Sequence, residues 1–597
     1  MSTTISGTTA ARPTLLGGGF LLGEVSPEEA FTPEDFSEEQ QQIYATADQF
    51  MTNEVVPTIA EQEEKKPGVA RKLMEKAGEL GLLATLVPEK FGGLELDLTT
   101  QMIVAERIGR YASFSTTYGA HSGIGTMPLV YFGTEDQKTR YLPKLVSAEW
   151  IAAYCLSEPQ AGSDALAART RAELSPDGKH YVLNGEKMWI SNGGWADLYT
   201  VFAKIDGEKF TAFLIERTMN GVRPGAEEHK MGIRGSSTTP LALDNVNVPV
   251  ENVLGEIGRG HIIAFNILNL GRVKLGAACV GGCKEILATT IRYANQRKAF
   301  GQSIGEFGLI QHKLAEMAIR LYATESLAYR TSGLIDRRRG SLSWEDPEAA
   351  HKALAAVEEY AIECSITKVY SSEALDYIVD EGVQIHGGYG FHQDYAVERA
   401  YRDARINRIF EGTNEINRLL TMGMLLKRAA KNRLPLMAAV EAAAKTVSGA
   451  SLEKPQDGPF ANEKHLLYRA KQATLFCAGV AYQRFQSELD QQQEVSAAVS
   501  DMVMAIFAAE SALLRAEKLI ERGRGEAARQ MTVVLVQDAI GQIERQATTA
   551  LAACGDGSAL DQQLAAVRRT LRHTPLNTIA LRRAIAGRLR TAEKYVV

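Results

Sequence analysis

The spacing of hydrophobic residues changes from helical to strand-like and back to helical along this chain. Helical spacing begins at Ser37 and continues to about 150, breaks into short apolar runs between 151 and 258, and returns from about 260. The longest helices are expected at 275–293, 309–335 and 348–380. The pattern predicts a mainly α protein with one β region in its middle.

The middle region has the features of an antiparallel sheet or barrel. Asn-Gly and Asp-Gly pairs, which favour hairpin turns, lie between short β-rich runs: Asn184-Gly185 between 181–183 and 188–190, and Asp206-Gly207 between 199–205 and 210–216. Helices between the strands are not expected, and a GxGxxG element after a strand is missing. A doubly wound dinucleotide-binding fold is therefore disfavoured.

Two regions flank this core. Residues 1–36 are rich in Gly, Pro and Thr without periodicity and are expected to form an arm lying on the surface, and 432–457 forms a weak boundary that includes Pro455. Beyond the boundary, apolar residues at alternating steps of four and three predict a long amphipathic helix: Val495, Val499, Met502, Ile506, Ala509 and Leu513. The expected parts are an arm at 1–36, a helical domain at 37–150, a β domain at 151–258, a helical bundle at 259–432 and a C-terminal helical extension at 433–597.

The composition argues against several classes of protein. The chain has 597 residues, 45% hydrophobic, with a net charge of −6, which gives no sign of a nucleic-acid-binding surface. No apolar run of about 18 residues, as a bilayer span needs, is expected, and the first forty residues resemble neither a secretory signal nor an import leader. Six scattered cysteines are expected to be free thiols in a reducing cytoplasm, and the histidines predict no metal site.

The most informative chemistry lies around Glu411. This carboxylate follows the apolar pair Ile409-Phe410 and precedes Gly412-Thr413 at an expected helix start. A carboxylate held in an apolar wall becomes a stronger base, which suits proton abstraction. The alternative is that Glu411–Asn414 is only a turn and helix cap, and spacing alone favours the cap.

Three further segments carry polar or flat side chains at turns. They are 154–164, with Ser157 and Ser163, then 187–193, with Trp189 and Ser191, and 297–301, with Arg297. Taken singly, the structural alternatives are favoured: the hydroxyl residues as turn caps, Trp189 as a core side chain and Arg297 as a solvated helix end.

Together, and in this order, the segments resemble the acyl-CoA dehydrogenase family over about residues 37–430. Length and the C-terminal extension are similar to the very-long-chain branch and its bacterial relatives. The resemblance implies an α+β, mainly α fold, with an N-terminal helical domain, a middle antiparallel β domain, a four-helix-bundle domain and the extra C-terminal helices. It also implies FAD as cofactor and a fatty acyl-CoA as substrate, oxidised to the trans-2-enoyl-CoA in the first step of β-oxidation.

The resemblance also implies roles for individual residues. Glu411 matches the catalytic base, and its backbone N–H would polarise the thioester carbonyl. The implied cofactor-binding residues are Tyr154, Leu156, Ser157, Gly162, Ser163, Trp189, Ile190, Ser191, Arg297, Phe300, Gln384, Gly387, Gly388, Thr413 and Glu415. Of these, Arg297 and 384–388 resemble contacts made to the flavin of a neighbouring subunit. The implied substrate-binding residues are Ser163, Asn269, Arg272, Phe410 and Gly412.

Two local features refine this assignment. Some branches of the family carry the base immediately before the arginine matched by Arg272, but here that position is Gly271, so Glu411 is the one matching carboxylate. Small residues at Gly119, Ala120 and Gly123 fall in the segment that resembles the pocket floor. They predict a deep pocket and a long-chain substrate, although helix packing would explain the same residues.

Several alternatives remain open at this stage. The expected electron acceptor is an electron-transfer flavoprotein, an acyl-CoA oxidase using oxygen is the rival enzyme, and a non-catalytic assembly protein on the same fold is the rival class. A homodimer is expected because the resemblance implies cross-subunit flavin contacts. The basic C-terminal residues, among them Arg568, Arg582 and Arg590, suggest either weak peripheral membrane contact or, preferentially, a helix face paired with acidic residues elsewhere.

Overall fold

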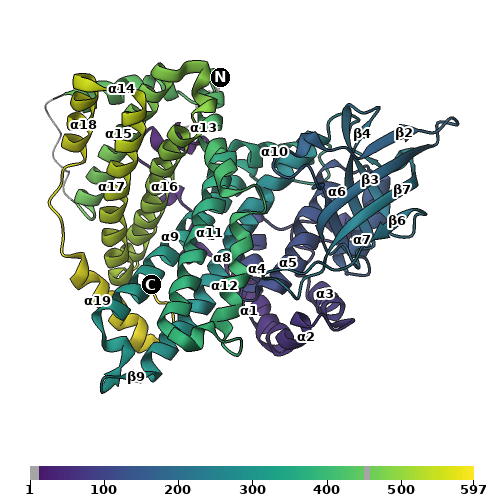
Figure 1. Ribbon diagram of the computed structural model, residues 1–597, viewed down its shortest axis with the longest axis horizontal. Coiled ribbons are helices and arrows are strands. Elements are labelled where there is room, and N and C mark those ends of the chain that lie inside the picture. The colour runs from purple at the N-terminus through teal and green to yellow at the C-terminus, as the bar shows by residue number, and fades with distance from the viewer. Residues whose placement is uncertain (1–12, 450–457) are drawn as a thin grey trace, which may run out of the picture.

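The computed structural model describes residues 13–449 and 458–597. In Figure 1 the β-sheet lies at one end of an elongated molecule, the C-terminal helices lie at the other, and the long helices of the bundle run between them. This arrangement confirms the predicted mainly α fold with a β region inserted between helical parts. Residues 1–12 of the expected arm and 450–457, with the Pro455 turn, lie outside the described residues.

The N-terminal domain consists of short helices: α1 (Glu38–Phe50), α2 (Ile59–Glu63), α3 (Val69–Glu79), α4 (Leu98–Ile108), α5 (Ala112–Gly119), α6 (Met127–Phe132) and α7 (Glu135–Val146). Ser37 is the N-cap of α1: its Oγ accepts a hydrogen bond from the Gln40 N–H at 3.1 Å while the Gln40 side chain accepts from the Ser37 N–H. This reciprocal cap fixes the start of α1. Between α5 and α6 the chain makes a π-helical turn, Ala120–Gly125.

The β domain is one eight-stranded sheet: β1 (Ala152–Cys155), β2 (Arg171–Leu174), β3 (His180–Ser191), β4 (Leu198–Ile205), β5 (Lys209–Glu216), β6 (Val222–Pro224), β7 (Thr238–Pro249) and β8 (Val253–Leu254). Most neighbours pair antiparallel, as predicted, but β1 and β2 each pair with β4 in parallel. The predicted turn at Asn184-Gly185 is wrong, because β3 runs straight through it with a bulge between Leu183 and Gly185. A β-carbon at Gly185 would lie 2.5 Å from Thr170 Oγ1, so glycine serves close strand approach here.

The bundle contains six helices: α8 (Gly260–Gln296), α9 (Gly308–Arg339), α10 (Ala349–Glu359), α11 (Ala361–His386), α12 (Ala396–Ala404) and α13 (Asn414–Ala430). A small hairpin, β9 (Lys298–Ala299) and β10 (Gln302–Ser303), follows α8. The single helix expected at 348–380 is in fact two, divided at Tyr360, and the second continues to His386. Glycines let α8 approach α4 closely, since a β-carbon on Gly281 would lie 1.8 Å from the Glu106 carbonyl oxygen.

The C-terminal extension adds α14 (Leu436–Ser448), α15 (Ala461–Phe485), α16 (Gln493–Glu521), α17 (Glu526–Cys554), α18 (Gly557–Leu571) and α19 (Thr578–Ala592). Buried residues of these helices belong to the same hydrophobic core as α8, α9, α11 and α13. The extension is therefore packed onto the bundle through a continuous apolar interior.

The arm does not lie on the surface as expected. Phe20 and Leu21 are each 2% exposed, and the Phe20 ring packs against Phe507 of α16 with 4.8 Å between ring centroids. The Gly18 N–H donates to Glu363 Oε1 at 2.7 Å, and a β-carbon on Gly17 would lie 1.8 Å from the Glu359 carbonyl oxygen. Its glycines let this segment thread between bundle and extension.

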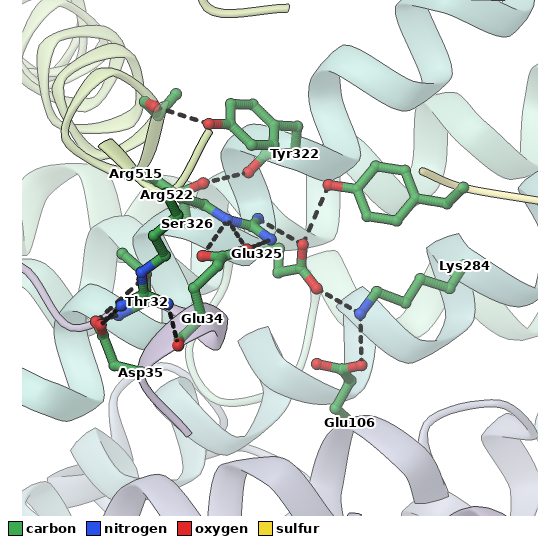
Figure 2. A network of polar contacts seen from close by, with 12 residues as sticks. Thr32, Glu34, Asp35, Glu106, Lys284, Tyr322, Glu325, Ser326, Arg515 and Arg522 are labelled. Carbon is green, nitrogen blue, oxygen red and sulfur yellow. Dashed lines mark hydrogen bonds and ion pairs between the residues drawn. The ribbon is translucent and has the colours of Figure 1, made fainter. Parts of the chain in front are cut away.

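A buried ionic network ties the parts together (Figure 2). Lys284 of α8 pairs with Glu106 of α4 at 2.8 Å and also with Glu325 of α9, which in turn binds Arg515 of α16 at 2.5 Å. Arg515 also pairs with Glu34 of the arm at 2.7 Å. Although burial alone would raise it, the charges of Arg515 and Lys284 lower the pKa of Glu325 to about 2.

Two apolar helices and part of the basic tail pack against the rest of the protein. The helices Gly260–Gln296 and Gln493–Glu521 are long and apolar enough to span a bilayer, contrary to expectation, but 72% and 89% of their most apolar windows are buried inside the protein. In the basic tail, Arg582 pairs with Glu316 and Asp538, each at 2.6 Å, and Arg590 pairs with Glu306 at 2.5 Å. These contacts support the expected pairing with acidic residues elsewhere.

Candidate active site

Glu411 lies in a tight turn directly before α13. Its backbone is left-handed, with φ of 59°, and Gly412 follows with φ of 78°. Thr413 then caps the helix, with Oγ1 accepting from the Ile416 N–H at 3.2 Å. The segment is thus a helix cap, as its spacing suggested, and the cap also points the preceding carboxylate away from the helix. A left-handed non-glycine residue stores strain and is common at functional sites.

Three buried side chains hold this turn from behind. Asn417 Nδ2 donates to the carbonyl oxygens of Gly412 at 2.8 Å and of Thr413 at 3.0 Å. Arg272 Nε donates to the Glu411 carbonyl at 3.2 Å, and its Nη1 donates to Asn269 Oδ1 at 2.7 Å. Asn269 and Arg272, expected at the substrate, are each 7% exposed. Arg272 supports the backbone of the Glu411 turn, and Asn269 supports Arg272.

The Glu411 carboxylate faces an apolar surrounding. Although the residue is partly exposed, its Oε2 atom is buried and has no hydrogen-bond partner among the described residues. A β-carbon at Gly271 would lie 2.6 Å from this oxygen, so the glycine of α8 makes the room for the carboxylate. Burial raises the pKa of Glu411 to about 7, against the opposing charges of Arg272, Lys368 and Lys274. The backbone N–H of Glu411 makes no hydrogen bond to the described residues, so it is free to donate to a ligand.

A cavity with about 890 Å³ of empty space, part of it open to solvent, begins at this carboxylate. Phe410 and Ser191 line it together with Glu411, and α4, α5, the π-helical turn, α8, α11 and residues 406–407 contribute most of the remaining wall. Much of that wall is made of small residues: Ala105, Gly109, Ala112, Ser115, Gly119, Ala120, Gly123, Gly271 and Ala278. The three small residues predicted to form a deep pocket therefore do line the cavity.

A flat aromatic ring and two hydroxyls lie on β3 and on the loop that follows β1, and one of them, Ser191, lines the cavity. Trp189 is 62% exposed and has a left-handed φ of 58°. The hydroxyls of Ser157 and Ser191 have no hydrogen-bond partner among the described residues. The Met188 N–H donates to the Ser157 carbonyl at 3.0 Å, which fixes the two segments to each other. An exposed flat ring beside free hydroxyls fits a planar, hydrogen-bonding ring system such as a flavin.

A buried ion pair stabilises this corner. Lys187 Nζ lies 2.7 Å from Glu158 Oε1, with both side chains nearly inaccessible. Glu158 also accepts from the backbone N–H groups of Arg169 at 2.6 Å and Thr170 at 3.1 Å. The turn that carries the exposed residues Gly162 and Ser163 is therefore fixed at its base.

The other expected cofactor residues divide into buried and exposed groups. Tyr154, Leu156 and Ile190 are at most 8% exposed, so their side chains belong to the core. Glu411 contributes to raising the pKa of Tyr154 after the main effect of burial, which places β1 close to the base. Glu415 is exposed on the first turn of α13.

The remaining predicted cofactor residues lie far from Glu411. Gln384, at the end of α11, is 16 residues beyond Lys368, which is about 24 Å along a helix. Near it the Arg297 guanidinium stacks on the Tyr389 ring at 5.4 Å, and Phe300 is 96% exposed. Gly387 and Gly388 are exposed beside them. One chain thus brings Arg297, Phe300, Gln384, Gly387 and Gly388 into a second group, here called the distal group, separate from the catalytic turn.

Sequence reasoning missed three residues around the base. Lys368 of α11 donates to Asn414 Oδ1 at 2.6 Å and lies behind the turn, Lys274 lines the cavity, and Asn417 holds the turn. Both lysines are buried within largely apolar helical stretches, where lysine is rarely found without a partner. A lysine in an apolar helical stretch is therefore the sequence feature that could have identified Lys274 and Lys368.

Comparison with known proteins agrees with this geometry. Models of the acyl-CoA dehydrogenase N-terminal, middle and C-terminal domains match residues 37–149, 153–246 and 258–426, and a further acyl-CoA dehydrogenase C-terminal domain model matches 469–569. A "Probable acyl-CoA dehydrogenase" of Bacillus subtilis (strain 168) is 48% identical over 97% of this chain and 98% of its own length. The human very long-chain specific acyl-CoA dehydrogenase is 40% identical over 67% of this chain and 60% of its own. A crystal structure of an acyl-CoA dehydrogenase from Bacillus anthracis complexed with FAD superposes with a TM-score of 0.96 at 48% identity, over 98% of this chain and 100% of that one.

Proposed function

Because this chain belongs to the acyl-CoA dehydrogenase family of FAD-dependent oxidoreductases, we propose that it oxidises long-chain fatty acyl-CoA to trans-2-enoyl-CoA, the first step of fatty acid β-oxidation. The observation that carries the proposal is the carboxylate of Glu411, whose buried Oε2 has no hydrogen-bond partner among the described residues and which lines the same cavity as Ser191. A base with a pKa near neutrality can accept a carbon-bound proton and release it again.

Each residue of the Glu411 turn and its support has a separate proposed role in the reaction. The free N–H of Glu411 donates to the thioester carbonyl, which makes the proton on the neighbouring carbon more acidic, and the carboxylate removes that proton. FAD, when bound, supplies the two-electron acceptor for the hydrogen on the next carbon. Asn417 and Arg272 keep the turn rigid, so that the carboxylate and the N–H act from fixed positions. Entry of an acyl chain removes water and strengthens the base further.

Residues near the Glu411 turn and residues of the distal group are both proposed to hold FAD. Trp189 would lie against the ring system, with the hydroxyls of Ser157 and Ser191 as hydrogen-bonding partners. Thr413 and Glu415 would contact the dinucleotide beyond the catalytic turn. The distal group cannot reach the same ring within one chain, so we propose that it contacts the FAD of a second copy in a homodimer.

Exposed apolar side chains support such a dimer. Phe300, Phe391 and Leu309 are 96%, 87% and 79% exposed. Phe300 lies in the turn of the β9–β10 hairpin, and Leu309 lies in the first turn of α9, which follows that hairpin. Large apolar side chains clustered at one exposed end are typical of a surface that a partner covers. Electron delivery to an electron-transfer flavoprotein and location in the cytoplasm are proposed on the resemblance alone.

The proposed long-chain preference rests on the small residues of the cavity wall. Gly119, Ala120 and Gly123 leave room where larger side chains would shorten it. Highest activity on four-carbon or branched short thioesters would contradict this preference.

The first test is an anaerobic titration of the FAD-loaded protein with acyl-CoAs of four to twenty carbons, followed by flavin absorbance. Bleaching that is strongest with long chains and absent in Glu411→Gln, with FAD still bound, is the expected result. Bound FAD that no acyl-CoA bleaches would overturn the proposed reaction. Peroxide formation at the full turnover rate under air would instead identify an oxidase.

Mixed dimers test the cross-subunit role. Arg297→Glu and Glu411→Gln subunits are each expected to be inactive as homodimers. In a mixed dimer, the Glu411 of the first subunit meets the Arg297 of the second, so one intact site forms. Activity near half that of the wild-type dimer is expected, whereas an inactive mixed dimer would place Arg297 and Glu411 in the same chain's site.

A further inference from the structure

The cavity contains a second charged side chain that the reaction described above does not use. Lys274 is 7% exposed and lies on α8, three residues after Gly271, the glycine against the Glu411 carboxylate. Three residues correspond to about 4.5 Å along a helix and return to nearly the same face. Lys274 and Glu411 are therefore adjacent parts of one cavity wall.

The contacts of Lys274 leave its charge without a close counter-ion. Nζ donates to Ser122 Oγ at 2.6 Å, and that hydroxyl donates to the Tyr118 carbonyl at 2.8 Å. Nζ also lies 4.7 Å from the centre of the Tyr118 ring. Neither partner is anionic, and no carboxylate of the described residues lies within 4.0 Å of the ammonium. Among the described residues that line the cavity, Glu411 is the one carboxylate and Lys274 the one cationic side chain.

The backbone around Lys274 accommodates this arrangement. Ser122 belongs to the π-helical turn Ala120–Gly125, a distortion common at functional sites. A β-carbon on Gly123 would lie 3.3 Å from Lys274 Nζ and 3.4 Å from its Cδ. The small residue at Gly123 thus leaves space for the lysine stem as well as for an acyl chain.

We propose that Lys274 is a positioning residue for the base, holding an ammonium in the acyl cavity that keeps Glu411 ionised before substrate enters. The proposal rests on the proposed role of Glu411 and adds a charge that sets the pH range in which the base is active. Burial lowers the pKa of Lys274 to about 7 and the charge of Glu411 opposes this, so each group favours the charged form of the other.

Other charges also face Glu411, but they are bonded to the turn itself. Arg272, also of α8, binds the Glu411 carbonyl, and Lys368 of α11 binds Asn414. Tyr154 faces the carboxylate from β1, and Lys274 itself faces Tyr118 and His121. Substituting Arg272 or Lys368 would disturb the backbone of the turn. Lys274 makes no hydrogen bond to the turn, so its substitution changes the charge with the least change in structure.

The test compares the FAD-loaded wild type with Lys274→Met, Lys274→Arg and Ser122→Ala. The first removes the charge at similar volume, the second keeps it, and the third removes the hydrogen bond alone. The pH dependence of kcat/KM is measured for one acyl-CoA, and the Glu411 carboxyl is titrated by infrared difference spectroscopy against Glu411→Gln.

In Lys274→Met, the midpoint of the kcat/KM profile and the midpoint of the infrared titration are both expected to rise by on the order of one pH unit. As a result, kcat/KM falls about tenfold below the midpoint and recovers above it. Lys274→Arg and Ser122→Ala should keep the wild-type midpoint. An unshifted midpoint in Lys274→Met, or an equal loss at every pH in Lys274→Met and Ser122→Ala, would overturn the proposal. Since the infrared titration needs no turnover, it still decides this point if no acyl-CoA proves to be a substrate.

Discussion

Replacing Gly271 by alanine should disable the base without weakening the fold. The added β-carbon would lie 2.6, 2.8 and 2.9 Å from three atoms of the Glu411 carboxyl group. Since carbon contacts normally begin near 3.5 Å, the carboxylate must withdraw by about 1 Å. A displacement of about 1 Å at a reacting group can lower a rate roughly 100-fold, equivalent to about 2.7 kcal/mol of transition-state stabilisation. Alanine inside a helix is itself about 1 kcal/mol more favourable than glycine, so unfolding would not explain the loss.

The assay is the rate of flavin bleaching by a long-chain acyl-CoA in an anaerobic stopped-flow experiment, which isolates the step proposed for Glu411. Gly423→Ala is the matched control, because a β-carbon at that position of α13 meets nothing within 4 Å. We expect the control to bleach at the wild-type rate, and both variants to retain FAD and the wild-type thermal midpoint. If Gly271→Ala, with FAD bound, bleached at a rate within twofold of the wild-type rate, the reaction would not depend on the exact position of the Glu411 carboxylate, contrary to this prediction.

Three further predictions concern the base, its support and the ionic network. The pKa of Glu411 is raised from 4.5 to about 7 in the folded protein. As pH rises between these values, the wild type should therefore lose stability relative to Glu411→Gln by up to about 1.4 kcal/mol per pH unit. Over the same range, kcat/KM should rise through about pH 7 as the base becomes ionised. Thermal midpoints across this range and a pH–rate profile measure both, and a constant difference between midpoints would contradict the buried carboxyl. Asn417→Ala removes the hydrogen-bond donor to the Gly412 and Thr413 carbonyl oxygens and should lower kcat at saturating substrate at least tenfold while FAD remains bound. An unchanged kcat would show that the turn keeps its conformation without these hydrogen bonds. Arg515→Ala removes one of the two cations paired with the buried Glu325 and should destabilise the protein by about 3–5 kcal/mol in calorimetry. Arg522→Ala, at a 40% exposed side chain, should have little effect, and equal losses in the two variants would contradict a stabilising role for the buried network.

Local sequence signals predicted the features that depend on neighbouring residues. Ser37 and Thr413 cap helices because each side chain reaches an N–H three residues later, which any chain with that sequence can do. Helical spacing located α9 and the start of α16, although both helices continue beyond the predicted ranges, to Arg339 and Glu521. The Asn184-Gly185 signal failed because the same pair serves a hairpin turn or a bulge, and the neighbouring Thr170 decides which.

Contacts between distant segments could not be predicted in this way. The arm has the composition of a surface segment, yet Gly18 and Phe20 are buried by Glu363 and Phe507, which lie hundreds of residues later. The network that joins Glu34 to Arg515 spans 481 positions of the sequence. No periodicity records such a pairing, because it depends on how whole helices pack.

The sequence by itself determined the succession of helical and β regions, which follows from near-neighbour geometry. Its resemblance to the family also pointed to Glu411 as the proposed base and to glycines that free space around the site. Only the tertiary structure decided that Gly271 faces Glu411, that Lys274 shares its cavity and that Arg272 and Asn417 hold its turn. The physical reason is that the basicity of a carboxylate depends on burial and on the charges around it, and α8, α11 and α13 supply both only when they pack together.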